Sequence, residues 1–194
     1  MSVATVTSAG DPEGENPTCC SETHAVSQSA EAATGESLYA LEKKLVDQRG
    51  TSIGLDVYRG HPVLVTMFFG HCRDVCPMQA ARIKAAIDSL GTEERKPLRV
   101  LMISLDPSRD TPPALATLAK TYGVDTPDWT FATASEDDVR EIAAALGIRY
   151  VRLPDGSFNH SAVVTLLDEG GVIRGRADGL TAPLAPLLAR SKSH

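Results

Sequence analysis

A continuous apolar segment, followed by a turn and a helical pattern, constrains the fold of this chain most strongly. Residues 62–69 read Pro-Val-Leu-Val-Thr-Met-Phe-Phe and contain no charge. Such a run predicts a central strand that is covered on both faces, because a half-exposed strand alternates polar and apolar side chains. Residues 75–90 then follow a helical spacing that ends at Gly91, a typical helix stop. The expected inner face of that helix holds Val75, Met78, Ile83, Ala86, Ile87 and Leu90.

The alternation of strand and helix patterns continues along the chain. The segment 38–45 predicts a short strand or helix, and Thr111 and Ser135 are expected to cap helices. The order of elements predicts an α/β sandwich that begins with an extra N-terminal hairpin. The further expected elements are a hairpin arm at 51–58, strands at 98–105 and 129–133, helices at 111–122 and 135–146, a hairpin of 162–167 with 172–176, and a closing helix at 180–190.

Residues 1–35 differ in composition from the remainder. They are rich in Ser, Thr, Ala, Gly and Glu and nearly lack large apolar side chains, so we expect a disordered tail or linker before a domain at 36–190. They also lack the charged start and apolar run of a signal peptide. Either the chain begins after a removed signal or anchor, or the protein is cytosolic.

The charge balance bears on the class of partner. The chain has 19 basic and 25 acidic side chains, a net charge of −6, and no basic patch along the sequence. We therefore expect no nucleic-acid partner, since binding to a phosphate backbone needs clustered positive charge. The apolar run at 62–69 is far too short to span a bilayer.

Two cysteines four residues apart follow the predicted central strand. Cys72 and Cys76 lie where the helix begins, and Asp74 is expected to cap it. The positive end of a helix favours thiolates, which are the ligands that Cu(I) prefers. Two other interpretations stay open, namely a pair of small buried side chains and a thiol–disulfide couple without metal.

Three separated motifs resemble those of the Sco/SenC family. They are Phe-Phe-Gly-His-Cys-Arg-Asp-Val-Cys-Pro at 68–77, Leu-Asp-Pro-Ser-Arg-Asp-Thr-Pro at 105–112 and Asn-His-Ser at 159–161. The resemblance covers about residues 38–188, with the motifs in the family's order. One departure is Arg73, where many members have proline after the first cysteine.

The resemblance implies a thioredoxin-like three-layer sandwich with a central mixed sheet. It also implies one copper ion, Cu(I) or Cu(II), bound by Cys72, Cys76 and His160. Family members act as copper chaperones or as thiol reductases in assembling the copper centre of cytochrome c oxidase. The implied partner is a copper-site protein, such as an oxidase subunit, or another copper chaperone. The implied location is periplasmic, or membrane-anchored and facing an exported compartment.

Two functions therefore remain in competition. The first is metal transfer by a chaperone, and the second is a thiol–disulfide oxidoreductase in which Cys72 and Cys76 are the redox-active pair. The cysteine spacing argues mildly against general thioredoxin chemistry, which uses Cys-x-x-Cys. We expect a monomer.

Several other residues have two interpretations. Cys19 and Cys20, with His24 nearby, form either a second copper site or an incidental thiol pair. His71 adjoins Cys72, but neighbouring side chains usually point apart. The 106–110 segment either serves local structure, through a cap at Asp110 or Thr111 and an ion pair of Arg109, or orients the metal loop.

Overall fold

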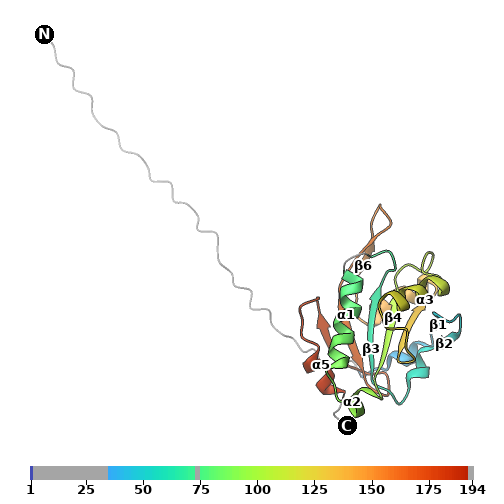
Figure 1. Ribbon diagram of the computed structural model, residues 1–194. Coiled ribbons are helices and arrows are strands. Elements are labelled where there is room, and N and C mark those ends of the chain that lie inside the picture. The colour runs from blue at the N-terminus through green and yellow to red at the C-terminus, as the bar shows by residue number, and fades with distance from the viewer. Residues whose placement is uncertain (2–34, 73–74, 192–194) are drawn as a thin grey trace. The chain divides into compact units, whose positions relative to one another are not determined.

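The computed structural model describes Met1, residues 35–72 and residues 75–191 (Figure 1). The predicted tail or linker, with Cys19, Cys20 and His24, lies outside the described residues, as do Arg73 and Asp74. In chain order the described elements are η1 (Leu38–Leu41), β1 (Lys44–Asp47), β2 (Ser52–Gly54), η2 (Leu55–Tyr58), β3 (Val63–Phe68), α1 (Val75–Asp88), α2 (Thr92–Arg95), β4 (Arg99–Ser104), α3 (Pro112–Thr121), β5 (Trp129–Thr133), α4 (Glu136–Ala145), β6 (Tyr150–Arg152), β7 (Phe158–His160), β8 (Val163–Leu167), β9 (Ile173–Asp178) and α5 (Ala185–Arg190).

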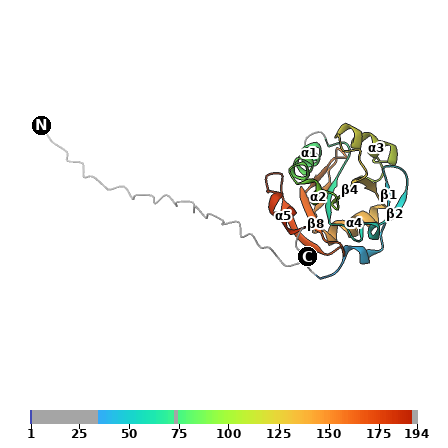
Figure 2. The same ribbon diagram turned by 60° about the horizontal axis from the view of Figure 1, so that its bottom comes forward.

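Seven of the described strands form one mixed sheet in the order β2-β1-β5-β4-β3-β8-β9. Strands β3, β4 and β5 are parallel, whereas β1, β8 and β9 pair antiparallel with their neighbours. Helices α1 and α3 lie over one face of the sheet and α4 over the other (Figures 1 and 2). The predicted α/β sandwich with a central mixed sheet is therefore confirmed.

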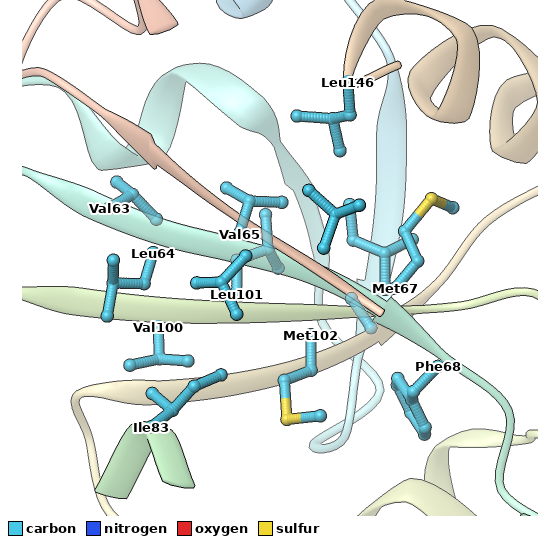
Figure 3. Packing of buried hydrophobic residues seen from close by; sticks show 14 of the residues in the cluster. Val63, Leu64, Val65, Met67, Phe68, Ile83, Val100, Leu101, Met102 and Leu146 are labelled. Atoms are coloured by element: carbon cyan, nitrogen blue, oxygen red, sulfur yellow. The ribbon is translucent and has the colours of Figure 1, made fainter. Parts of the chain in front are cut away.

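The core lies on both faces of β3 and β4. Every residue of β3 is buried, as expected for a central strand covered on both sides. Figure 3 shows Ile83 of α1 on the side of Met102, and Leu146 after α4 on the opposite side. Phe68 packs edge-on against Phe131 of β5, with ring centroids 5.5 Å apart.

The inner face of α1 differs from the predicted one in its first turn. Met78 is 57% exposed, and the helix instead buries Cys76, Gln79, Ala80 and Ile83. The spacing of apolar residues does not reveal this face, because the polar Gln79 occupies one of its inner positions. The Gln79 amide is tolerated there because its N–H group donates a buried hydrogen bond to the Thr66 hydroxyl of β3 (2.8 Å).

The N-terminal hairpin and the cap at Ser135 agree with the sequence, whereas Thr111 stands at the predicted N-cap of α3 without a side-chain capping bond. Strands β1 and β2 pair antiparallel, and Ser135 accepts a hydrogen bond from the Asp138 N–H (3.1 Å). The hairpin arm is shorter than predicted because η2 replaces its second half. Leu55 and Tyr58, three residues apart, both become buried through that turn of 3₁₀-helix.

The β6–β7 hairpin and α2 were not predicted. In the described part of the chain β6 and β7 form a two-stranded sheet of their own, in which Tyr150 pairs with His160. His160 is therefore the last residue of a strand and not part of a plain loop before β8. No helix of the described ranges is both long enough and apolar enough to cross a bilayer.

Candidate metal centre

The two cysteines occupy the turn and first helical residues after β3. The turn is closed by the Cys72 N–H, which donates to the Phe69 carbonyl (3.1 Å). The Cys76 N–H donates to Cys72 Sγ at 3.3 Å, and both cysteines are free thiols. Cys72 is partly exposed, whereas Cys76 is only 1% exposed. The pair thus has an outer sulfur that a partner can reach and an inner one that solvent cannot.

The inner thiol does not show the acidity expected from its place at a helix start. Burial raises the pKa of Cys76, and this outweighs a hydrogen bond from the Phe69 backbone that lowers it. Cys76 is consequently protonated at neutral pH in the metal-free protein. A metal ion that binds this sulfur has to displace its proton.

His160 approaches Cys76 from a segment 84 residues further along the chain. Its Nε2 lies 3.9 Å from Cys76 Sγ, and its Nδ1 lies 3.1 Å from the Ser161 carbonyl oxygen. A carbonyl only accepts, so Nδ1 carries the proton and Nε2 presents a lone pair towards the sulfur. Burial lowers the pKa of His160, which favours the neutral imidazole that metals bind.

Aromatic packing holds the His160 hairpin against the cysteine turn. Phe69 contacts Phe158 (5.5 Å between ring centroids) and meets the His160 ring edge-on (5.9 Å). Tyr150 adds a third ring against Phe158 at 6.2 Å. The histidine is therefore seated on the residue that directly follows β3.

The donor atoms suit a soft metal, but they are not yet gathered around one point. Two sulfurs and one imidazole nitrogen match the preferences of Cu(I) and also accept Cu(II). Across residues 35–72 and 75–191, no three His, Cys, Asp or Glu side chains lie close enough together to hold a metal as they stand. Of the three candidate ligands, Cys76 and His160 have their donor atoms 3.9 Å apart.

Asp110 reaches the cysteine turn. The sequence leaves the cap of α3 to Asp110 or Thr111; the N-cap position is that of Thr111, whose side chain makes no capping bond. The Asp110 carboxylate instead accepts from the Gly70 N–H (2.8 Å) and the Ser104 hydroxyl (2.5 Å). Burial raises the pKa of Asp110, although these two hydrogen bonds oppose the shift.

Arg109 reaches the other side of the site. Its guanidinium pairs with Asp106, as the sequence predicts, and also donates to the carbonyl of Gly156 in the β6–β7 turn. The second contact was not predicted, because nothing in the sequence indicates that the two segments meet.

Two more aromatic residues near the site were missed. Burial, with Cys76 and Cys72 close by, raises the pKa of Tyr122 to about 12. Phe158 was missed along with its hairpin, whose signals were β-branched and aromatic residues at 150–151 and 158 on either side of the turn sequence Pro154-Asp155-Gly156. The side chain of His71 is exposed at the start of the turn, and no described contact brings it to His160.

Comparison with known proteins extends this description. The sequence profile of the SCO1/SenC family matches residues 31–192. A protein from Stutzerimonas stutzeri that is provisionally named a copper-binding protein is 27% identical over 155 residues, which cover 75% of this chain and 74% of the relative. An SCO2-like protein from Rickettsia prowazekii is 26% identical over 66% of this chain, which spans 63% of that relative's length.

Solved structures agree with the fold. A SCO1/SenC family lipoprotein from Bacillus anthracis superposes with a TM-score of 0.73 at 21% identity, over 84% of this chain and 96% of that one. Copper-bound ScoI from Arabidopsis thaliana gives 0.66 at 22%, over 76% and 91%. BsSco, described as a member of the Sco family of cytochrome c oxidase assembly proteins with a disulfide switch, superposes with a TM-score of 0.67 at 24% identity, over 77% of this chain and 89% of that one.

The family profile covers the whole described domain, including Cys72, Cys76 and His160. The fold of the described residues is that of solved Sco proteins. On these grounds the chain belongs to the SCO1/SenC family.

Proposed function

We propose that this protein is a copper chaperone that takes up copper through Cys72, Cys76 and His160. It delivers the metal to the copper centre of cytochrome c oxidase or assists the assembly of that centre. The observation that carries the proposal is the approach of His160 Nε2 to 3.9 Å from Cys76 Sγ, with Nδ1 tied to a backbone carbonyl. A histidine held in this way presents its free nitrogen as a ligand.

The exposure of the two sulfurs fits transfer better than permanent storage. The partly exposed Cys72 is an entry point at which an incoming thiolate can displace one ligand at a time. The buried Cys76 and the partly buried His160 would hold the metal until exchange is complete. Copper is thus the cargo of the site, and the copper-bound Arabidopsis ScoI supports its identity.

The proposed partner is a copper-site protein, such as an oxidase subunit, or a second copper chaperone. The description of BsSco as a cytochrome c oxidase assembly protein supports this assignment. The proposed location is periplasmic, or anchored to a membrane and facing an exported compartment. The lipoprotein from Bacillus anthracis supports that part of the proposal.

A second candidate function is reduction of a disulfide in a copper-site protein. The observation that favours it is the hydrogen bond from the Cys76 N–H to Cys72 Sγ (3.3 Å), which holds the two residues of a potential disulfide next to each other. The Cys72 thiolate would attack one sulfur of the target disulfide and release the other as a thiolate. Cys76 would then attack Cys72, forming the Cys72–Cys76 disulfide and freeing the second target thiol, so that the chain supplies both electrons.

Anaerobic titration with Cu(I) and with Cu(II) tests the proposal in wild type, Cys72→Ala, Cys76→Ala and His160→Ala. We expect one tightly bound copper at this centre, a thiolate-to-Cu(II) absorption band, loss of tight Cu(I) in either cysteine variant and loss of tight Cu(II) in His160→Ala. A single-turnover assay with a disulfide peptide separates the second candidate, because a reductase keeps its rate in His160→Ala. Absence of tight copper in wild type with intact thiols would reject the chaperone.

A further inference from the structure

One loop contacts both arms of the candidate centre. We call residues 106–110 the clamp loop, residues 69–72 together with 75–76 the cysteine arm, and the β6–β7 hairpin the histidine arm. Asp110 of the clamp loop binds the backbone of the cysteine arm, and Arg109 binds the backbone of the histidine arm.

The contact with the cysteine arm is buried and tight. Asp110 is 1% exposed and accepts the Gly70 N–H at 2.8 Å. A Cβ on Gly70 would overlap Asp110 Oδ1 and would lie 3.0 Å from Leu118, so only glycine allows this approach. The turn that leads to Cys72 is therefore fastened to a buried carboxylate.

The contact with the histidine arm is made by the guanidinium of Arg109, which binds two groups at once. Arg109 pairs with the carboxylate of Asp106, which is 2% exposed, and donates to the Gly156 carbonyl at the tip of the hairpin. Ser104 joins the two halves of the clamp loop, because its hydroxyl donates to Asp110 (2.5 Å) and accepts from the Asp106 N–H (2.9 Å). The Asp110 and Arg109 contacts thus belong to one loop but reach separate arms.

We propose that Arg109 and Asp110 are positioning residues for copper, Arg109 for His160 and Asp110 for Cys72. This inference rests on the proposed copper-binding function. The histidine arm needs an external support because an isolated two-stranded hairpin is at best marginally stable in water. The planar fork of arginine can serve Asp106 and Gly156 together, whereas a lysine ammonium is a single point charge.

The two contacts should have different effects on the two oxidation states. Cu(I) is satisfied chiefly by the two thiolates, while Cu(II) depends more on the imidazole nitrogen. Loosening the histidine arm alone should therefore weaken Cu(II) binding and spare Cu(I). Loosening the cysteine arm should weaken both.

The test of the histidine arm compares Arg109→Lys with Arg152→Gln in the full chain. Arg152 is a matched control on the same hairpin, where its guanidinium stacks over the Phe158 ring (5.9 Å). We expect Arg109→Lys to lower Cu(II) affinity about ten- to a hundredfold, the usual effect of losing an orienting partner, with Cu(I) affinity unchanged. Nitrogen hyperfine structure in the Cu(II) electron paramagnetic resonance spectrum should weaken as well.

A metal-free measurement accompanies the titration. Amide hydrogen exchange of residues 150–160 should accelerate in Arg109→Lys and stay at the wild-type rate in Arg152→Gln. Amide hydrogen exchange in β3 and β8 should not change, because the main sheet does not depend on the contact between Arg109 and the Gly156 carbonyl.

The test of the cysteine arm compares Asp110→Ala with Asp110→Asn. Asparagine keeps one oxygen that can accept from both the Gly70 N–H and the Ser104 hydroxyl, as Asp110 Oδ2 does, so it should restore most of the affinity that alanine loses. Asp110→Ala should weaken Cu(I) and Cu(II) together.

Three results would overturn the inference while wild type binds copper as proposed. In the first, Arg109→Lys keeps the Cu(II) affinity and the hairpin hydrogen-exchange rates of wild type. In the second, Arg109→Lys loses Cu(I) affinity and Cu(II) affinity equally. In the third, Asp110→Asn binds copper no better than Asp110→Ala. Failure of wild type to bind either ion would instead reject the proposed function on which the inference rests.

Discussion

Asp110 is the residue at which electrostatics and site geometry conflict most directly. Burial raises the pKa of its carboxyl, whereas hydrogen bonds from Ser104 and Gly70 act in the opposite direction. The folded protein therefore binds the Asp110 proton more tightly than the unfolded chain does. That preference stabilises the fold fully below the unfolded pKa of about 3.9 and is lost as pH rises through the higher folded pKa.

Asp110→Asn removes this pH dependence, since the amide does not ionise. We expect the free energy of unfolding of wild type, minus that of the asparagine variant, to decrease as pH rises from below 4 towards 7. Urea unfolding of both proteins across that pH range measures the difference, in which the other titrating groups cancel. A difference that is flat, or that grows with pH, would contradict the raised pKa.

At the scale of elements, a buried polar contact attaches α1 to the sheet. Gln79 of α1 donates to Thr66 Oγ1 of β3 (2.8 Å), and that hydroxyl donates to the Val163 carbonyl (2.7 Å). Helix α1 carries Cys76, so this contact also supports the candidate centre. The neighbouring Thr165 of β8 is equally buried, yet its hydroxyl has no hydrogen-bond partner among the described residues.

The two threonines make a matched pair for mutation. Thr66→Val should cost about 1–3 kcal/mol in the free energy of unfolding, because it leaves the Gln79 amide without its best partner. Thr165→Val has the same change of shape but breaks no bond, so it should be neutral or stabilising. Urea denaturation reports both values, and equal losses in the two variants would show that the hydroxyl contact contributes nothing.

At the scale of the whole molecule, the first described contacts with the sheet begin at Ser37. Its hydroxyl donates to the Gly170 carbonyl (2.5 Å), and the Leu38 N–H donates to the Gly171 carbonyl (2.9 Å). These bonds fasten the beginning of the domain beside the β8–β9 turn.

Because the composition of residues 1–35 predicts a tail that buries no core, a chain that starts at residue 35 should keep the stability of the full protein, within about 0.5 kcal/mol. It should also bind one copper. If Cys19 and Cys20 hold a second ion, the full chain binds two and both the shortened chain and the Cys19→Ser/Cys20→Ser variant bind one. Thermal unfolding and metal analysis distinguish these cases, and a clear loss of stability on shortening would contradict the predicted tail.

The sequence by itself determined the features that depend on neighbouring residues. The uncharged run at 62–69 could only become a strand covered on both faces, and Ser135 could cap a helix because the group it binds is three residues away. Cys72 and Cys76 are four residues apart, so their common place at the start of α1 also follows from local geometry. Motif order was enough to predict which histidine completes the proposed centre.

Only the tertiary structure decided which distant groups meet. His160 reaches Cys76 across 84 residues, Arg109 finds the Gly156 carbonyl and Gln79 becomes an inner residue of α1. Thr66 and Thr165 are the same residue type in similar apolar strands, yet one hydroxyl is bonded and the other is not. Local spacing cannot separate such cases, because a partner's identity depends on how the layers pack and on which atoms that packing leaves within hydrogen-bonding distance.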